Sequence, residues 1–550
     1  MFCSALSILR ARLLVHTPCS LYKYNLQFSF IVNVRENMNV HFFALLLIQL
    51  WAKNVSGQGL EFYVSVDGSD SWDGTAESNI DGSDVGPWQT LNHAIDELRR
   101  IRPNPPTAES PATIYLLPGM HFLTSTIAMN QKDSFLTLKS LYAEEEVAVS
   151  GGMVLDGEWI EDGSGIRTIK FEGSCSEAYV GSQRLIPARS ANLLETSQNV
   201  NLAGPPYNII KGLLVETETC KRNTTAYSQN CPDEDREGFI FEDEFSPDWS
   251  FLEQTKVLIY HSGIAEFAFV GNITEENGDN KVFFTSPLTR DPIGNVPKSS
   301  GWRFLIFNNL ALLDIPGECV CNDMGDGTAQ FSYKHPDGPE FEGLPVIVAK
   351  LNPLINSVGA TDVLMEGIQF SHSSSDGAIN SDFGQASALR IISTENFNII
   401  DCKFTQTGMT GVYSTDSSNV QITRSVFTDI GYHAIQFHYK QESDELEGQQ
   451  DVSIDNNMFD GCGVNNFWQP ACVKLGGYKN MTIRNNEFTS CPYHHIRITG
   501  LMPHGATYWD DNGITEPTRD DYIFHIEYNY ISQFGMGILN DMGAVYISRF

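Results

Sequence analysis

A repeated segment in the last third of the chain is the feature that most constrains the fold. Each copy is a short run that alternates polar and apolar residues and ends in phenylalanine. The phenylalanines of successive copies are 34, 23, 32 and 29 residues apart, so the copies differ in the loops between them. The copies are 363–370, 397–404, 420–427, 452–459 and 481–488, and a sixth copy, 524–531, has Ile531 in the Phe position.

A second strand-like run follows each copy, at 378–380, 411–413, 434–438, 472–476, 495–499 and 544–548. One such unit cannot bury its own apolar side chains, but stacked units can, with Phe and Ile or Val in internal rows. Because crossover connections between parallel strands are overwhelmingly right-handed, the repeat predicts an all-β fold, a right-handed parallel β-helix (solenoid). A β-propeller is the structural alternative, but its repeats need about 40 residues and four strands each.

Residues 60–179 are interpreted as an N-terminal cap and the first coils. Apolar residues recur at helical spacing from Leu91 to Ile101, Thr90 can cap the helix, and Pro103 ends it. This amphipathic helix is expected to cover the open edge of the first coil. Strands are expected at 62–66, 113–117, 134–138 and 147–150.

Residues 180–355 lose the repeat and predict a β-rich inserted subdomain, with strands at 257–260, 266–270 and 281–285. The β-helix repeats then occupy 356–550. Because the sequence stops inside a coil, we expect the repeat array to be truncated at its C-terminus.

The N-terminal 57 residues are interpreted as a leader and signal peptide. The apolar run at 41–52 is too short for a spanning helix and has the length of a signal-peptide core, with cleavage expected near Gly57. A single N-terminal membrane anchor is the alternative. Glycosylation sequons at Asn223, Asn272 and Asn480 agree with a secreted, extracellular glycoprotein.

The formal net charge of -33 argues against nucleic acid or an anionic membrane as a partner, apart from the signal peptide's own membrane contact. A local cationic patch can still bind an anionic sugar at short range. A polysaccharide or oligosaccharide is therefore the expected partner, and no cofactor is expected.

Nine of the 11 cysteines follow the apolar run, and several should pair in an oxidising compartment. Cys220 with Cys231 closes a short loop and is the first expected disulfide. Another bond is expected among three cysteines on adjacent repeats, Cys462, Cys472 and Cys491. The pair Cys319 and Cys321 does not match a zinc pattern, because no second CxxC or paired histidines accompany it.

The second strand of each unit predicts a binding face. If its Ile or Val points inward, the next residue points outward, and successive coils lie about 4.8 Å apart. A polar and aromatic row suits an extended sugar chain, although outer positions of any solenoid are polar. The residues are Asn380, Tyr413, Gln436, Lys474, Arg497 and Tyr546.

Lys474 and Arg497 are neighbours in this row, with His494 and His495 in the turn before it. Two adjacent cations favour a carboxylate or sulfate group on the ligand, and the alternative is that each pairs with a local Asp or Glu. No metal site is expected from the two histidines, because consecutive residues on a strand face opposite ways.

Asp541 is the candidate catalytic residue, because it directly precedes a strand of the row; the alternative is a turn aspartate beside Gly543. Glycoside hydrolysis usually needs two carboxyl groups, and no second acid is obvious. The loop 501–523 contains aromatic and acidic residues that suit either a sugar subsite or an ordinary solvated loop.

Residues 63–74 with 87–91 and 114–119, residues 302–318, and residues 541–546 carry a family resemblance. The chain resembles secreted right-handed β-helix proteins with pectin-lyase-like (PbH1) repeats, most nearly glycoside hydrolase family 141. The resemblance implies glycosidase activity on plant or algal polysaccharide and an active-site role for Asp541. The alternatives are a polysaccharide lyase that uses Lys474, Arg497 or a histidine, and a non-catalytic glycan-binding protein.

Overall fold

The computed structural model describes residues 59–190, 208–214, 236–241, 249–260, 265–288, 303–375, 386–438, 450–465, 470–476, 479–499, 524–533 and 543–548. Several predicted features lie outside these ranges: the apolar run 41–52, the loop 501–523, Cys220, Cys231, Asn223, Asn380 and Asp541. Across the described ranges, none of the helices has the length and apolar character needed to cross a bilayer.

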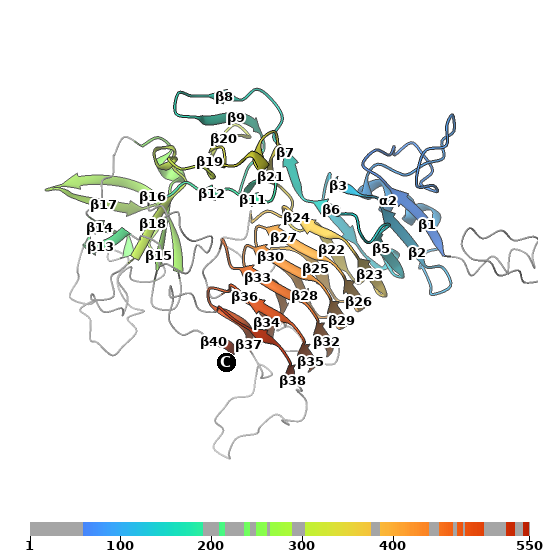
Figure 1. The fold of residues 1–550 in the computed structure, drawn as a ribbon. Coiled ribbons are helices and arrows are strands. Elements are labelled where there is room, and N and C mark those ends of the chain that lie inside the picture. Colours follow the sequence, from blue (N-terminus) through green and yellow to red (C-terminus); the bar gives the residue numbers. More distant parts are fainter. Residues whose placement is uncertain are drawn as a thin grey trace, which may run out of the picture. The chain divides into compact units, whose positions relative to one another are not determined.

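Three parallel sheets stack coil upon coil in the described part of the chain (Figure 1). Sheet A has nine strands, and sheets B and C have eight each. From the second strand of sheet A onward, each coil passes from sheet A to sheet B to sheet C and then returns to the next strand of sheet A. This arrangement is a parallel β-helix, so the predicted fold class is confirmed and the propeller is excluded.

The strands of sheet A are β1 (Leu60–Val64), β2 (Ala112–Leu116), β5 (Leu136–Ser140), β23 (Val363–Glu366), β26 (Glu395–Ile400), β29 (Ser418–Thr423), β32 (Gln450–Asp455), β35 (Lys479–Arg484) and β38 (Phe524–Glu527). Those of sheet B are β3 (Gly119–Phe122), β6 (Val147–Ser150), β24 (Gln369–Ser371), β27 (Lys403–Thr407), β30 (Val426–Ile430), β33 (Met458–Cys462), β36 (Glu487–Thr489) and β39 (Tyr530–Ile531). Those of sheet C are β4 (Ile127–Met129), β22 (Ile355–Val358), β25 (Ser387–Ile392), β28 (Thr410–Thr415), β31 (Ile435–His438), β34 (Ala471–Gly476), β37 (His494–Thr499) and β40 (Gly543–Ser548).

Each run that the sequence predicts as one strand is two strands separated by a bend. In the run 397–404, β26 ends before Asp401 and β27 begins after it. Asp401 has φ +52°, in the left-handed region that turns the chain out of an extended strand. The same bend recurs at Arg424, Asn456 and Asn485. The repeating phenylalanine therefore belongs to sheet B and does not end a strand of sheet A.

A row of asparagines fixes this bend in the later coils. Asn457, Asn486 and Asn529 each follow the left-handed residue, and the first two are buried. Each Nδ2 donates to a main-chain carbonyl of the preceding coil, at 2.9 Å for Ile422, 3.0 Å for Ile454 and 2.9 Å for Ile483. Each Oδ1 accepts a main-chain N–H from that coil, at 2.8 to 3.0 Å. The row thus pairs polar groups that would otherwise be buried without partners.

The phenylalanines of sheet B stack inside the coils. Their centroids are 5.0, 4.9, 5.0 and 4.6 Å apart, in the order Phe370, Phe404, Phe427, Phe459 and Phe488. All five rings are fully buried in one core cluster that runs from the first coils to the last. The predicted internal row is confirmed, and it holds successive coils in register.

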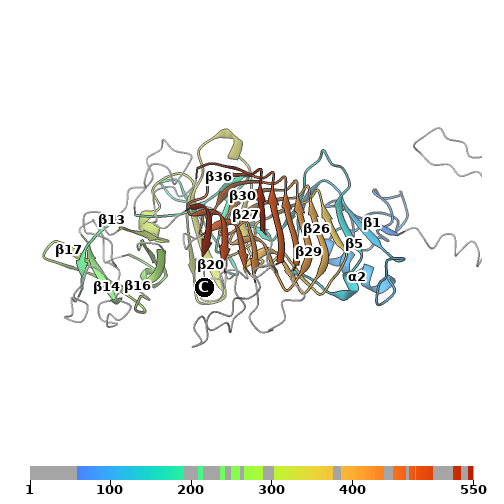
Figure 2. The same ribbon diagram turned by 90° about the horizontal axis from the view of Figure 1, so that it is seen from below.

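The predicted cap helix is α2 (Leu91–Ile101), which lies beside β1 at the N-terminal end of the coils in both views (Figures 1 and 2). Thr90 caps it as expected, because its hydroxyl accepts the N–H of His93 at 3.2 Å. Leu91, Ala94, Ile95 and Leu98 are buried in the same core cluster as the first coils. Short 3-10 helices occur at Gln131–Asp133, Leu252–Gln254, Leu310–Leu312 and Pro339–Phe341.

Mainly antiparallel strands interrupt the coil between β6 of sheet B and β22 of sheet C. Sheet D has the order β11-β10-β21-β7, sheet E has the order β12-β19-β20-β9-β8, and a closed barrel has the order β13-β14-β17-β16-β15-β18. Sheets D and E comprise β7 (Gly152–Val154), β8 (Ile160–Glu161), β9 (Ile166–Glu172), β10 (Ala178–Val180), β11 (Gln183–Arg184), β12 (Ile186–Pro187), β19 (Glu318–Asp323), β20 (Thr328–Lys334) and β21 (Val346–Ala349). The barrel comprises β13 (Asn208–Leu213), β14 (Gly238–Phe241), β15 (Lys256–Tyr260), β16 (Ala265–Glu276), β17 (Asp279–Phe284) and β18 (Arg303–Phe307).

One disulfide, Cys175–Cys321, is present among the described cysteines, and the sequence did not suggest this pairing. Its partners are 146 residues apart and meet because the β19–β20 hairpin pairs with β9, which ends shortly before Cys175. Cys319, Cys402, Cys462, Cys472 and Cys491 are buried free thiols. The expected bond among Cys462, Cys472 and Cys491 is therefore wrong in this structure.

Sheet D is fixed to sheet B by polar contacts of two residues. Arg184 Nε donates to Asp429 Oδ1 at 2.8 Å, and its guanidinium lies 4.9 Å from the centre of the Tyr179 ring. The Tyr179 hydroxyl donates to the carbonyl of Gln406 at 2.9 Å. These buried contacts attach the inserted strands to the coils.

We expect Asn457→Ala to destabilise the protein by about 3 kcal/mol, because it leaves the buried carbonyl of Ile422 and the N–H of Ser425 without partners. Urea unfolding of the full chain measures the change. Gln421→Ala, an exposed amide on the neighbouring strand, is the matched control and should change stability little. Equal stabilities of the two variants would contradict a supporting role for the asparagine row.

His372 makes stability depend on pH. Its buried ring lies 4.9 Å from that of Tyr179, and burial, aided by Arg184, lowers its pKa from 6.5 to about 4. Between pH 6.5 and 4 the unfolded chain takes up a proton that the folded ring does not, so stability falls as pH falls through this range. The full difference is about 3 kcal/mol. Thermal unfolding should lose less stability over this range in His372→Gln than in the wild type, and parallel pH curves would refute this origin.

Candidate functional site

Consecutive strands of sheet C place one row of polar and aromatic side chains in register. Strand pairing aligns Tyr413 with Gln436, Gln436 with Lys474, Lys474 with Arg497, and Arg497 with Tyr546. The predicted register is therefore confirmed over five strands. Arg390 of β25 aligns with Tyr413 and occupies the position that the sequence assigned to Asn380. We call Arg390 and these five residues the sheet C row.

The sheet C row is more buried than the sequence suggested. Tyr413 and Gln436 are only 3% and 2% exposed, whereas Lys474, Arg497 and Tyr546 are half-buried. The ring of His438 stacks on Tyr413 with centroids 6.3 Å apart, which accounts for part of this cover. Adjacent coils also shield side chains in the middle of a sheet more than those at its end. The row therefore offers a ligand desolvated polar groups, which interact more strongly than exposed ones.

Two histidines occupy equivalent positions at the start of sheet C strands. The Nδ1 of His433 accepts the N–H of Ala471 at 2.9 Å, and the Nδ1 of His494 accepts the N–H of Gly543 at 3.2 Å. Each Nδ1 also lies within hydrogen-bond distance of the carbonyl of the same residue, at 3.3 Å for Ala471 and 3.1 Å for Gly543, so either neutral tautomer can form a hydrogen bond there. A tyrosine precedes each histidine and packs on it, with centroids 3.8 Å apart for Tyr432 and 4.1 Å apart for Tyr493.

The charges of the sheet C row act on His433. Burial lowers the pKa of His433 well below its usual value, and the nearby charges of Lys474 and Arg497 lower it further. The imidazole is therefore neutral at neutral pH. His494 lies against Tyr546, with the two ring centroids 4.3 Å apart.

Three polar atoms along the row are buried without hydrogen-bond partners in the described part of the chain. They are His433 Nε2, Gln436 Oε1 and Arg497 Nε. Buried polar atoms in folded proteins normally have partners, and exceptions often mark functional sites. Their grouping indicates a site for a polar ligand on sheet C.

The structure does not bring His495 to the row. Its ring is fully buried inside the coil, 3.4 Å from the Cys472 sulfur, and burial lowers its pKa to about 4. By contrast, His494 joins the row through its contact with Tyr546. Asn272 and Asn480 are exposed, and their glycosylation stays a prediction.

Sequence reasoning missed His433 and Glu177. The repeated Tyr-His dipeptide at 432–433 and 493–494 is the signal that identifies His433. Glu177 is nearly buried and accepts the Asn465 side-chain amide at 3.1 Å. Asn465 donates its main-chain N–H to Gly431, two residues before His433. No sequence pattern could link Glu177 to this turn, because it belongs to the inserted strands.

Comparison with known proteins supports the fold. The family model described as "Right handed beta helix region" matches residues 387–540. The structure is similar to a solved structure titled "Glycoside hydrolase", with a TM-score of 0.65 and 15% identity over 89% of this chain and 85% of that chain. The chain is a right-handed parallel β-helix protein.

A second structure, "The complex structure of XylC with xylose", matches the β-helix protein with a TM-score of 0.41 and 11% identity over 80% of this chain and 60% of that one. No curated protein matches the β-helix protein in sequence. At these identities the comparisons establish the fold alone.

We expect sulfate to raise the thermal unfolding midpoint of the β-helix protein by binding beside Lys474 and Arg497, because a ligand that binds only the folded state stabilises it. Lys474→Gln and Arg497→Gln should each weaken this shift. Arg424→Gln is the matched control, because Arg424 is paired with Asp401 at the bend between sheets A and B. An equal sulfate response in all three variants would contradict an anion site on sheet C.

Proposed function

We propose that the protein is a secreted carbohydrate-active enzyme, a glycoside hydrolase that acts on plant or algal polysaccharide along sheet C. One observation carries this proposal. Lys474 and Arg497 are aligned on neighbouring strands, within one row that also holds a buried amide and two tyrosines. The likeness in fold to a structure titled "Glycoside hydrolase" supports the same reaction class.

The sheet C row suits an extended sugar chain. It advances by about 4.8 Å per coil, so one ligand can contact several strands. The half-buried Tyr546 ring offers a face for a sugar ring at the end of the row. Lys474 and Arg497 together favour a carboxylate or sulfate substituent, which points to an anionic polysaccharide.

Hydrolysis of the glycosidic bond requires a carboxyl group that protonates the leaving oxygen and a second that activates water or attacks the sugar. We assign one of these roles to Asp541, which lies two residues before β40 in the sequence. The family resemblance of the stretch 541–546 supports this assignment.

A polysaccharide lyase is the second candidate function, and the aligned cations Lys474 and Arg497 favour it. In this reaction a base removes the proton next to a uronate carboxylate, while Lys474 and Arg497 stabilise the resulting negative charge. The bond to the leaving oxygen then breaks, that oxygen takes up a proton, and a carbon–carbon double bond forms. The product therefore differs from that of hydrolysis.

One assay separates the two reactions. The full chain, secreted from eukaryotic cells, is incubated with neutral and anionic plant and algal polysaccharides, and reducing ends and ultraviolet absorbance are followed together. A hydrolase releases reducing ends without new absorbance, whereas a lyase produces both. Binding without either signal would support a non-catalytic glycan-binding protein.

We expect Asp541→Asn to lower turnover by about 100-fold or more while polysaccharide binding is kept, because the amide cannot transfer the proton. Asp401→Asn is the matched control, since Asp401 forms an ion pair at the bend between sheets A and B. If Asp541→Asn keeps full activity and both Lys474→Gln and Arg497→Gln lose it, the lyase function replaces the hydrolase function.

A further inference from the structure

Four residues with soft or nitrogen ligand atoms occupy one internal corner of two consecutive coils. Strand pairing aligns Phe459 with Phe488, so Cys462 and Cys491, each three residues later, occupy equivalent positions. Pairing of Val473 with Ile496 places Cys472 and His495 in equivalent positions as well. The corner between sheets B and C thus holds three thiols and one imidazole, all nearly or fully buried.

The same positions carry apolar side chains in the coil before. Ile430 aligns with Cys462, and Ala434 aligns with Cys472, and both are fully buried. In the coil after, Ala544 occupies the position equivalent to that of His495. The neighbouring coils therefore fill this corner with aliphatic side chains. The two coils that carry cysteine and histidine there are consecutive, so the exceptions lie next to each other.

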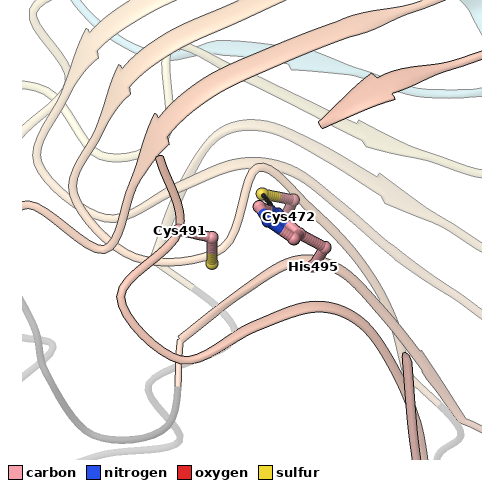
Figure 3. Close-up of side chains that lie close together, drawn as sticks. All are labelled: Cys472, Cys491 and His495. Atoms are coloured by element: carbon pink, nitrogen blue, oxygen red, sulfur yellow. Dashed lines mark hydrogen bonds between the residues drawn. The ribbon is translucent and has the colours of Figure 1, made fainter. Parts of the chain in front are cut away.

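The ligand atoms are close enough to bind one ion. The sulfurs of Cys472 and Cys491 and a ring nitrogen of His495 all lie within 4.8 Å of one another (Figure 3). Cys472 Sγ is 3.4 Å from His495 Nδ1, and Cys462 is a neighbour of Cys472 in the same corner. Tetrahedral zinc, with bonds of about 2.3 Å to sulfur and 2.0–2.1 Å to nitrogen, needs ligand atoms roughly 3.5–3.8 Å apart. Small movements of Cys472, Cys491 and His495 would close three of the bonds, and the Cys462 side chain would have to move further to supply the fourth.

The histidine is already oriented as a metal ligand. His495 Nε2 donates to the carbonyl of Ser532 at 2.8 Å, which leaves the lone pair of Nδ1 facing Cys472. A hydrogen bond from the second ring nitrogen to a carbonyl commonly fixes the tautomer and orientation of metal-bound histidine. The Phe488 ring beside it, with centroids 5.8 Å apart, limits the freedom of the imidazole.

We propose that Cys462, Cys472, Cys491 and His495 bind a structural zinc ion in the interior of the β-helix. Three thiolates and one imidazole form a donor set that is common in structural zinc sites, and four protein ligands in a buried corner leave no open position for water. The ion links two consecutive coils beneath the sheet C row. Sequence reasoning excluded a metal at His494 and His495 together, but this site uses only His495 and takes its other ligands from separate turns.

The test uses the full secreted chain, with zinc measured by elemental mass spectrometry and free thiols counted after denaturation. We expect one zinc ion per chain, lost in Cys472→Ser and in His495→Gln. Cys402→Ser is the matched control, because Cys402 is a buried free thiol at another corner and donates to the carbonyl of Met365. This control should keep its zinc.

Cobalt gives a readout that does not depend on the folding of the variants. Wild-type protein exchanged into cobalt should show thiolate-to-cobalt charge-transfer absorption and the visible bands of tetrahedral cobalt. A disulfide between two of the three cysteines, wild-type protein with free thiols and no zinc, or zinc retained in Cys472→Ser and His495→Gln would each overturn the proposal.

Discussion

Register between successive coils is the constraint on which the rest of this structure depends. A β-helix coil has no apolar core of its own, so each side chain inside it is buried mainly by the equivalent side chains of the coils on either side. The stacked rings of Phe370, Phe404, Phe427, Phe459 and Phe488 show this most plainly. The asparagine row at the bend after sheet A adds a polar equivalent, in which each side chain both donates to and accepts from the main chain of the coil before. A slip of one residue would break both rows at once.

The same register builds the sheet C row. Tyr413, Gln436, Lys474, Arg497 and Tyr546 lie on five strands, separated by loops of very different length, yet strand pairing aligns them. Loop length varies freely because the loops leave the coil at its corners, where no pairing is required. The turns can therefore differ in sequence and in length without disturbing the sheet C row that a ligand would contact.

The inserted strands are the largest example of this variation in loop length. They leave the coil between β6 and β22, form their own cores, and return to the solenoid through contacts such as Arg184 with Asp429. Through Glu177 and Asn465 they also reach the turn that precedes His433. The Glu177 carboxylate of the insertion is therefore linked through Asn465 to the turn before β31 of sheet C.

The sequence by itself determined the fold class, the cap helix with its Thr90 cap, and the register of the sheet C row, because each of these follows from local periodicity and from Phe recurring at equivalent positions. It did not reveal that each run bends at residues such as Asp401 into two strands, since aspartate and asparagine enter the left-handed region only when neighbouring coils hold them there. Only the tertiary structure decided the burial of Tyr413 and Gln436, the neutral state of His433, the Cys175–Cys321 bond, and the meeting of Cys472 and Cys491 with His495. Each of these features depends on which side chains lie in the coils above and below. The residues that meet are about 20 to 150 positions apart in the sequence, so no local pattern indicates their contact.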